Sequence, residues 1–254
     1  MIEQFRAIQR LLCVGRVMLS ANFTRIRRNP VDRALWQQRQ SKRFLNALKI
    51  EVRSIGELPK EGLLVCNHLS YLDIIAIASL GPVVFVAKSD LAGWPLIGNL
   101  LRKSGTILAY RNHPIKSAQT ALEIESALSN GLTVVLFPEG TSSNGESVFP
   151  FRSPFFQPAH KTASLVTPAA LKYTSESGDP QEDICYWGEH MFASHLMKLT
   201  TLQKITAHLN FGEAQPCLAN RKESAVYFHR EVSALHAALK DRFSDLSEGI
   251  VKSV

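Results

Sequence analysis

The sequence predicts an α/β domain with a single, largely parallel mixed sheet flanked by helices, preceded by a basic amphipathic two-helix segment. From residue 63 onward, short apolar runs alternate with helical patterns, which is typical of such a sheet. Residues 1–55 instead carry 12 basic and three acidic residues, a net charge of +9. The other 199 residues carry 17 basic and 19 acidic residues, a net charge of −2. We therefore expect a helical segment over residues 1–55 and the α/β domain over residues 56–254.

Composition excludes several classes of protein. The 254 residues are 45% hydrophobic, which is too apolar for a disordered chain and enough for one domain plus an extension. No apolar run reaches the roughly 18–20 residues of a membrane-spanning helix. The early apolar stretch 11–21 contains Arg16 and lacks a small-residue cleavage site, so we expect no secretory signal. The four cysteines lie far apart without a C-x-x-C pair, which predicts free thiols and neither a disulfide nor a zinc site.

Two helical patterns make up the N-terminal segment. Placed on a helix, residues 2–20 gather five apolar side chains within about one third of the circle, opposite Arg6 and Arg10. These are Phe5, Ile8, Leu11, Leu12 and Leu19. Asn29-Pro30 interrupts the pattern, because the residue before a proline is disfavoured in a helix. Residues 34–50 form the second pattern, with apolar and basic side chains on opposite sides.

The charge and amphipathicity of this segment leave three interpretations open. Both helices could lie in the interface of an anionic membrane, where each Lys or Arg contributes on the order of 1 kcal/mol. They could instead pack on the domain with solvated basic faces. A nucleic-acid-binding arm is the third interpretation.

The remaining elements follow from the alternation of short apolar runs and helical periodicity. The predicted strands are 63–66, 83–87, 106–109, 133–137, 164–170, 184–187 and 204–211. The predicted helices are 71–80, 94–103, 114–129, 154–162, 190–200 and 221–243. The turn-rich stretches 142–147 and 174–183 are expected to be surface loops. In such a sheet the chemistry belongs at the carboxyl ends of the strands, where Asn67-His68, Lys88, Tyr110-Arg111 and residues 138–141 are expected.

Three features at these strand ends point to chemistry. His68 is expected in a strand-to-helix turn, so that Asp73 in the following helix can bind its Nδ1 and make the imidazole a competent general base. Pro138 and Gly140 flank Glu139, and they predict a tight turn that presents the Glu139 carboxylate outward. Arg111 ends another strand, and its guanidinium suits bidentate recognition of phosphate or carboxylate.

Four blocks of the sequence together resemble the glycerolipid acyltransferases, the lysophosphatidic acid acyltransferase family. They have the order and spacing of that family over about residues 60–172. The blocks are Asn67-His68-x-x-x-x-Asp73, Gly105 to Arg111, Phe137-Pro-Glu-Gly-Thr141 and Val166-Thr-Pro168. H-x-x-x-x-D alone is unspecific, but in order with F-P-E-G-T it is a strong signature.

The resemblance implies an acyltransferase in which His68, oriented by Asp73, takes the proton of a lysolipid hydroxyl as that oxygen attacks an acyl thioester. It implies that Arg111, Glu139, Gly140, Thr141 and Arg152 bind the acceptor. No metal or cofactor is implied, because acyl-CoA or acyl carrier protein is a co-substrate. Cys66 is expected to be a strand residue and not a nucleophile.

One departure from the family bears on the acceptor. Many members place an arginine directly after F-P-E-G-T, whereas this chain has Ser142 and keeps a downstream basic residue, Arg152. The form F-P-E-G-T-S-S with a later F-R-S resembles a bacterial subgroup that includes lyso-ornithine lipid acyltransferases. We therefore expect fewer basic residues around the acceptor phosphate in this chain than in those members.

The implied function is a membrane-associated O-acyltransferase, with 1-acyl-sn-glycerol-3-phosphate as acceptor and phosphatidic acid as product. Lyso-ornithine lipid or another lysolipid is the alternative acceptor. A non-enzymatic lipid-transfer or tethering module is the alternative class. The expected partners are an anionic membrane surface, the lysolipid and the acyl carrier, with no nucleic acid. The expected location is the cytoplasmic face of a membrane, such as a bacterial inner membrane, as a peripheral or monotopic protein.

Overall fold

A seven-stranded sheet organises the described part of the chain. The computed structural model describes the backbone of residues 2–27, 29–110 and 113–251 and the side chains of those ranges between residues 4 and 243. The strands are β1 (Ile50–Ile55), β2 (Gly62–Cys66), β3 (Val84–Lys88), β4 (Ile107–Ala109), β5 (Thr133–Leu136), β6 (Val166–Thr174) and β7 (Ile205–Phe211). Their order is β1-β7-β6-β2-β5-β3-β4. β6 and β7 run antiparallel and the other neighbours run parallel. This confirms the predicted fold class.

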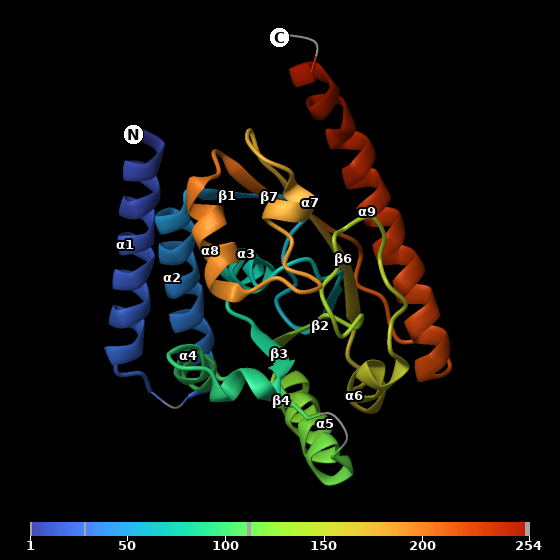
Figure 1. Cartoon of the computed structure of the whole chain (residues 1–254). Coiled ribbons are helices and arrows are strands. Elements are labelled where there is room, and N and C mark those ends of the chain that lie inside the picture. Colours follow the sequence, from blue (N-terminus) through green and yellow to red (C-terminus); the bar gives the residue numbers. More distant parts are fainter. Residues whose placement is uncertain (1, 28, 111–112, 252–254) are drawn as a thin grey trace.

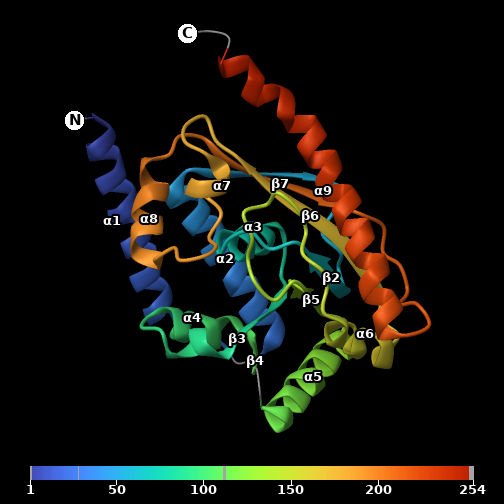
Figure 2. The same cartoon turned by 45° about the vertical axis from the view of Figure 1, so that its right-hand side comes forward.

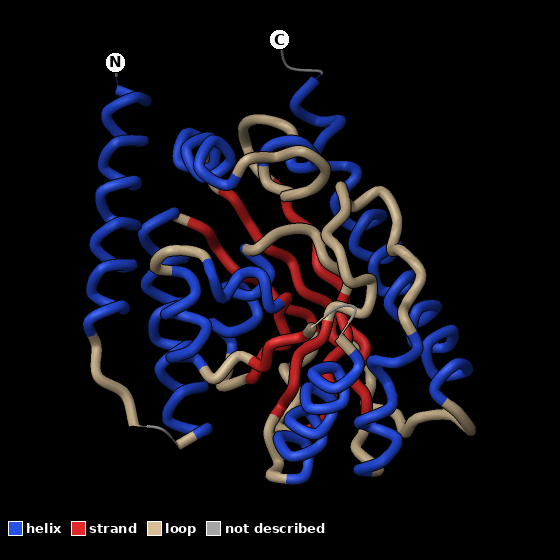
Figure 3. The backbone as a smooth tube through the Cα atoms, turned by 60° about the horizontal axis from the view of Figure 1, so that its bottom comes forward, coloured by secondary structure: helices blue, strands red, loops and turns tan. Residues whose placement is uncertain are grey.

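Helices cover both faces of the sheet (Figures 1 and 2). They are α1 (Ile2–Phe23), α2 (Pro30–Leu48), α3 (Leu72–Leu80), η1 (Ser89–Gly93), α4 (Ile97–Ser104), α5 (Pro114–Ser129), η2 (Ser153–Phe156), α6 (Gln157–Thr162), α7 (Pro180–Asp183), α8 (Phe192–Thr201) and α9 (Arg221–Val251). The strands lie between them as one twisted layer (Figure 3).

The central strand β2 shows why the sequence requires two covering layers. Leu63 and Val65 pack into one apolar cluster with Phe156 and Phe228, whereas Leu64 and Cys66 pack into another cluster on the opposite face. All of these β2 side chains are fully buried. A parallel strand buried on both faces is apolar at every position instead of alternating, which is the pattern that predicted this strand.

The structure corrects the predicted elements at several places. The stretch 174–183, predicted as a loop, contains the short helix α7, and the helix predicted to end at residue 243 continues to Val251. Three further corrections concern the sheet and the helix before it. The predicted strand 184–187 is a loop between α7 and α8, because Ile184 and Cys185 are buried without pairing in the sheet. The helix predicted to reach residue 50 ends at Leu48, where Lys49 adopts φ 59° and caps the helix. Strand β1 follows at once and pairs with β7, so the sheet begins inside the range predicted as the N-terminal segment. Strand β6 continues to Thr174, beyond the predicted end at residue 170.

Helix α1 buries one face and exposes an apolar stripe on another. Val14, Val17 and Ala21 are buried, and the Arg10 guanidinium donates to the carbonyls of Thr200 and Leu202 at the end of α8. The apolar residues predicted to share one side of the helix remain 40–64% exposed. They are Phe5, Ile8, Leu11, Leu12 and Leu19. Packing on the domain therefore uses a different face of α1 and leaves this stripe exposed.

Among the helices of the described residues, none combines the length and the apolar character needed to cross a membrane.

Candidate active site

The turn after β2 is fixed by Asn67. The side chain of Asn67 accepts a hydrogen bond from the Leu171 N–H at 2.7 Å and donates to the Leu171 carbonyl at 3.0 Å. This amide therefore ties the end of β2 to β6, although the two strands are about one hundred residues apart in the chain. The chain leaves the sheet at this point, so His68 and the start of α3 have a defined position.

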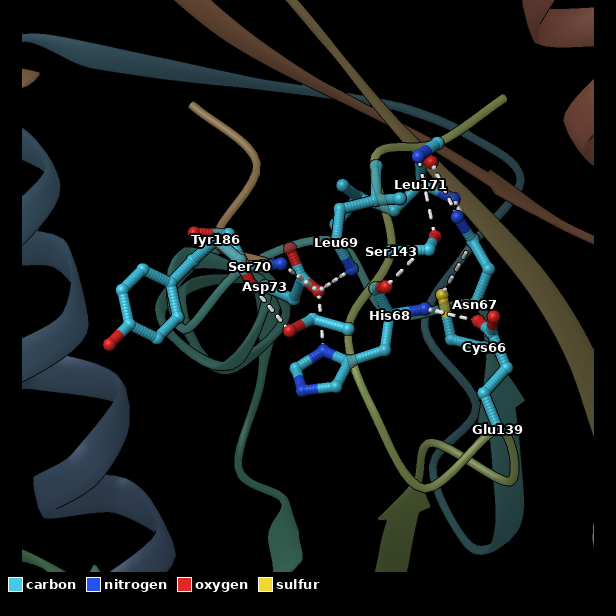
Figure 4. Close-up of polar contacts among 12 residues, drawn as sticks. Cys66, Asn67, His68, Leu69, Ser70, Asp73, Glu139, Ser143, Leu171 and Tyr186 are labelled. Atoms are coloured by element: carbon cyan, nitrogen blue, oxygen red, sulfur yellow. Dashed lines mark hydrogen bonds and ion pairs between the residues drawn. The ribbon is translucent and has the colours of Figure 1, made fainter. Parts of the chain in front are cut away.

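His68 and the buried Asp73 form a directional pair, as their spacing predicted (Figure 4). His68 Nδ1 lies 2.8 Å from Asp73 Oδ2. The same carboxylate oxygen accepts the backbone N–H groups of Leu69 at 2.7 Å and Ser70 at 3.0 Å. Asp73 has no exposed surface, so burying its charge requires these donors. A carboxylate that already accepts two N–H groups fixes the proton of His68 on Nδ1 and leaves Nε2 as the basic nitrogen.

The ring of His68 stands at a partly open position. It stacks on Phe137 with ring centroids 4.3 Å apart and planes 16° apart, and its side chain is 22% exposed. Nε2 points away from Asp73 and makes no hydrogen bond to a described residue. The imidazole is thus held from one side and free to accept a proton on the other.

Tyr173 completes the contacts of Asp73, and sequence reasoning did not identify it. Its hydroxyl donates to Asp73 Oδ1 at 2.8 Å. Burial, the charge of Asp73 and this hydrogen bond raise the pKa of the Tyr173 phenol well above its ordinary value, so the phenol stays a donor. Leu171 and Tyr173 stand at alternate positions and so continue the strand pattern. This alternation could have identified Tyr173, but the predicted strand ended at residue 170.

The carboxylate of Glu139 faces the backbone and not the solvent. Because β5 neighbours β2, the turn after β5 brings Glu139 beside His68. Its oxygens accept the backbone N–H of His68 at 2.7 Å and of Phe149 at 2.8 Å, and Glu139 is 3% exposed. Burial raises the pKa of Glu139 to about 7, although the hydrogen bonds from the two N–H groups act to lower it. The predicted outward presentation is therefore wrong in this structure, because both oxygens are used to join two loops.

Three of the other residues expected to bind the acceptor, Gly140, Thr141 and Arg152, lie at or beside the same turn. Gly140 adopts φ +71°, and a Cβ at this position would lie 3.0 Å from Arg152 Nε, so the guanidinium rests against the glycine. Thr141 and Arg152 are both exposed. The Ser142 hydroxyl donates to the Tyr186 carbonyl and folds back on the chain. Arg111 lies outside the described residues.

Cys66 is placed where it cannot act as a nucleophile. It has no exposed surface, and burial raises the pKa of its thiol well above the ordinary value. The thiolate is the reactive form of cysteine, and a buried thiol in apolar surroundings is inert.

Comparison with known proteins decides the family. The family model described as Acyltransferase matches residues 49–172. A lyso-ornithine lipid O-acyltransferase from Pseudomonas aeruginosa is 33% identical over 175 residues, which cover 68% of this chain and 67% of that protein. One from Rhizobium meliloti is 31% identical over 221 residues, 81% of this chain and 75% of that protein. The chain belongs to the acyltransferase family.

This acyltransferase is of the type that includes lyso-ornithine lipid and lysophosphatidic acid acyltransferases, as the sequence resemblance indicated. A 1-acyl-sn-glycerol-3-phosphate acyltransferase from Neisseria meningitidis is 28% identical over 199 residues, 78% of this chain and 72% of that protein. The crystal structure of the 1-acyl-sn-glycerophosphate acyltransferase of Thermotoga maritima has a TM-score of 0.65 over 94% of this chain and 98% of that chain. At 19% identity, this second likeness supports the fold alone.

Proposed function

We propose that this acyltransferase transfers a fatty acyl chain from an acyl thioester to the free hydroxyl of a lysolipid, with His68 as general base. The observation that carries the proposal is the orientation of His68 by Asp73, which leaves Nε2 basic and accessible. As the hydroxyl oxygen forms a bond to the thioester carbonyl carbon, Nε2 takes its proton. The C–S bond then breaks, and the proton passes to the departing thiolate. General-base assistance of this kind contributes about 10²–10⁴-fold.

Within this mechanism, Asp73 and Glu139 have different tasks. Asp73 stabilises the imidazolium that forms when His68 takes the proton, because it is a fully buried anion in direct contact with Nδ1. Glu139 accepts the backbone N–H of His68 and thereby positions that residue. Its carboxylate is buried and presents no exposed oxygen to a substrate. We therefore propose Glu139 as a positioning residue. Arg152 is then the exposed cation beside the turn that can bind the acceptor head group.

For the acceptor, we propose lyso-ornithine lipid. The relatives from Pseudomonas aeruginosa and Rhizobium meliloti bear that name, and they are more similar to this chain than the lysophosphatidic acid acyltransferase from Neisseria meningitidis. The folded-back Ser142, in place of the arginine of many family members, removes a cation from the turn. Among the described residues of the turn, Arg152 is an exposed cation, and its guanidinium can bind a carboxylate through two parallel hydrogen bonds. Lysophosphatidic acid, the acceptor first expected from the sequence, is the second candidate, and the likeness to the Neisseria meningitidis protein favours it.

The acyl donor and the location are further parts of the proposal. Acyl-CoA or acyl carrier protein supplies the thioester as a co-substrate, and the proposed reaction calls for no resident cofactor or metal. The apolar stripe of α1 and the +9 charge of residues 1–55 support attachment to the cytoplasmic face of an anionic membrane as a peripheral or monotopic protein. Nucleic acid is not among the proposed partners.

The test is an assay of purified protein with an acyl thioester, in which released thiol and acylated lipid are both measured. Lyso-ornithine lipid and lysophosphatidic acid are compared at equal concentration in the same vesicles. We expect thiol release that depends on the acceptor and a higher kcat/KM for lyso-ornithine lipid. A higher kcat/KM for lysophosphatidic acid would replace the proposed acceptor. Absence of thiol release with every lysolipid would reject the enzymatic function in favour of a lipid-transfer or tethering module.

A further inference from the structure

An open groove lies between helix α9, strand β7, the end of strand β6 and the loop that follows β6, and it has no role in the mechanism above. Figure 2 shows α9 running along β6. The cavity volume is about 1270 Å³, whereas sites for small molecules have roughly 300–1,000 Å³. We call this cavity the α9 groove. The lining residues that matter here are Lys172, Thr174, His208, His236 and Lys240.

The two surfaces that face each other across the groove become polar at the same level. On β6, Ala170 packs into the apolar cluster beneath α9, but Lys172, the next residue on that face, lines the groove. On α9, Val232 packs into the same cluster, but His236 and Lys240, one and two helical turns later, line the groove. The groove is therefore a polar cavity built from both surfaces and not a continuation of the core.

Positive charge remains in the groove after its acidic side chains are accounted for. Each acidic residue that lines it already has a partner. These are Glu51 with Arg53, Glu176 with Lys204, and Asp179 with the backbone N–H of Gln181. Lys240 donates to the carbonyl of Glu146 at 3.0 Å, a neutral acceptor. Burial and the charge of Lys240 lower the pKa of Lys172, and the charge of Asp241 offsets them only in part. Lys172 and Lys240 thus form an incompletely neutralised pair of cations.

His236 adds a hydrogen-bond donor that the chain leaves unused. It is 4% exposed, lines the groove and makes no hydrogen bond to a described residue. The other buried histidine of the groove, His208, is satisfied, because its Nε2 lies 2.8 Å from the Thr174 hydroxyl. Buried polar side chains normally have a partner, and a neutral imidazole offers one N–H donor. His236 therefore points to an acceptor that a bound molecule would supply.

The groove lies behind the catalytic pair and not on the side where the reaction occurs. Its inner end is lined by Leu69 and Tyr173, which both donate to the Asp73 carboxylate. Nε2 of His68 points away from Asp73. The Leu69 carbonyl also accepts the Tyr186 N–H at 2.7 Å, which ties the turn to the loop before α8. A molecule in the groove is therefore separate from the lysolipid hydroxyl and the thioester.

We propose that the α9 groove binds a phosphate monoester, held by Lys172 and Lys240 and by an N–H of His236. A phosphate monoester is close to a dianion at neutral pH, which matches two lysines, and its oxygens accept the imidazole N–H. The volume of the groove indicates that the phosphate belongs to a larger molecule, of the size of a nucleotide. This inference does not depend on the proposed acyl transfer, and it gives the protein a second ligand.

Calorimetric titration of the purified full chain tests the proposal without an activity assay. The probes are AMP, glycerol 3-phosphate and inorganic phosphate, with adenosine as the control that lacks the phosphate. We expect AMP to bind, adenosine not to bind, and the affinity for AMP to fall as KCl is raised. Tighter binding of AMP than of the smaller probes would identify a nucleotide as the carrier of the phosphate, and the reverse order a small phosphorylated metabolite. Equal affinities for AMP and adenosine, or no heat with any phosphate, would overturn the proposal.

Variants on the two sides of the groove locate the binding site. Lys172→Gln and Lys240→Gln should each weaken phosphate binding about tenfold, because each removes a charge-assisted hydrogen bond. Lys222→Gln, which removes an exposed lysine of α9 outside the groove, is the matched control and should bind like the wild type. We expect all three variants to keep the wild-type Tm and acyl-transfer rate in phosphate-free buffer. Phosphate binding that Lys172→Gln and Lys240→Gln leave unchanged would place the ligand elsewhere and contradict the proposal.

Discussion

The hydroxyl of Tyr173 and the carboxylate of Asp73 lie 2.8 Å apart, although one hundred residues separate them in the chain. Tyr173 stands on β6 and Asp73 in the first turn of α3, so the contact joins the sheet to the helix that carries the pair with His68. Both residues are buried. The orientation of His68 therefore depends on long-range packing as well as on the local turn.

Loss of the Tyr173 hydroxyl should weaken both stability and catalysis. Tyr173→Phe leaves Asp73 Oδ1 without a donor in a buried site, which costs about 1–3 kcal/mol of unfolding free energy. We expect kcat to fall about tenfold, because the carboxylate holds His68 less firmly, with little change in the KM of the acceptor. Denaturant unfolding and steady-state kinetics measure the two effects. Tyr227→Phe, whose hydroxyl has no partner among the described residues, is the control. A Tyr173→Phe enzyme with wild-type kcat would contradict the assigned positioning role.

The kinetics of Glu139→Gln distinguish a positioning residue from a substrate contact. A glutamine can accept only one of the two backbone N–H groups that Glu139 accepts from His68 and Phe149. We expect about 1–3 kcal/mol of destabilisation and a reduced kcat, with the acceptor KM nearly unchanged. A large rise in KM at unchanged kcat would show that the carboxylate binds the head group, as the sequence resemblance first implied.

Ser142→Arg should change the preference for the acceptor. The variant exchanges a hydroxyl bound to the Tyr186 carbonyl for a guanidinium at the turn beside Arg152. We expect the ratio of kcat/KM for lysophosphatidic acid to that for lyso-ornithine lipid to rise at least tenfold. Ser142→Ala, which loses only the hydrogen bond, is the control. If the ratio is the same in all three proteins, position 142 does not determine the head group.

A buried histidine should make stability depend on pH. His236 on α9 is 4% exposed, and burial, Lys240 and Lys172 lower its pKa to about 4. The unfolded chain takes up this proton near pH 6.5 and the native state only near pH 4. The stabilisation is therefore present above pH 6.5 and is lost towards pH 4, at up to about 1.4 kcal/mol per pH unit. His236→Gln should flatten the dependence of unfolding free energy on pH between 4.5 and 6.5. An unchanged slope would contradict the assignment.

The strand–helix alternation was sufficient to predict the sheet. It failed for residues that are buried without pairing in the sheet, and for a strand that pairs in the sheet while its side chains stay largely exposed. Ile184 and Cys185 are as apolar and buried as a strand, yet they fill the space beside α3 without a strand partner. Strand β1 was missed for the opposite reason. It lies at the edge of the sheet, where Glu51 and Arg53 alternate with apolar residues and pair with each other in solvent. Only Lys49 separates it from helix α2, which leaves no turn signal in the sequence.

The candidate site was predictable where contacts are local. Asp73 is the fifth residue after His68, so one strand-to-helix turn was enough to predict their contact. Tyr173 and the role of Glu139 could not be predicted in this way, because each depends on which strands are neighbours. A Pro-Glu-Gly turn predicts a tight bend, but only the pairing of β5 with β2 places the backbone of His68 within reach of the carboxylate.

The central claim is that Nε2 of His68 takes the proton of the lysolipid hydroxyl. The most direct test is the rate of acyl transfer by His68→Ala, measured with lyso-ornithine lipid and lysophosphatidic acid, after circular dichroism and Tm establish that the variant is folded. We expect kcat to fall about 10²–10⁴-fold for every acceptor that the wild type uses. A folded His68→Ala enzyme that transfers acyl chains at the wild-type rate would contradict the account.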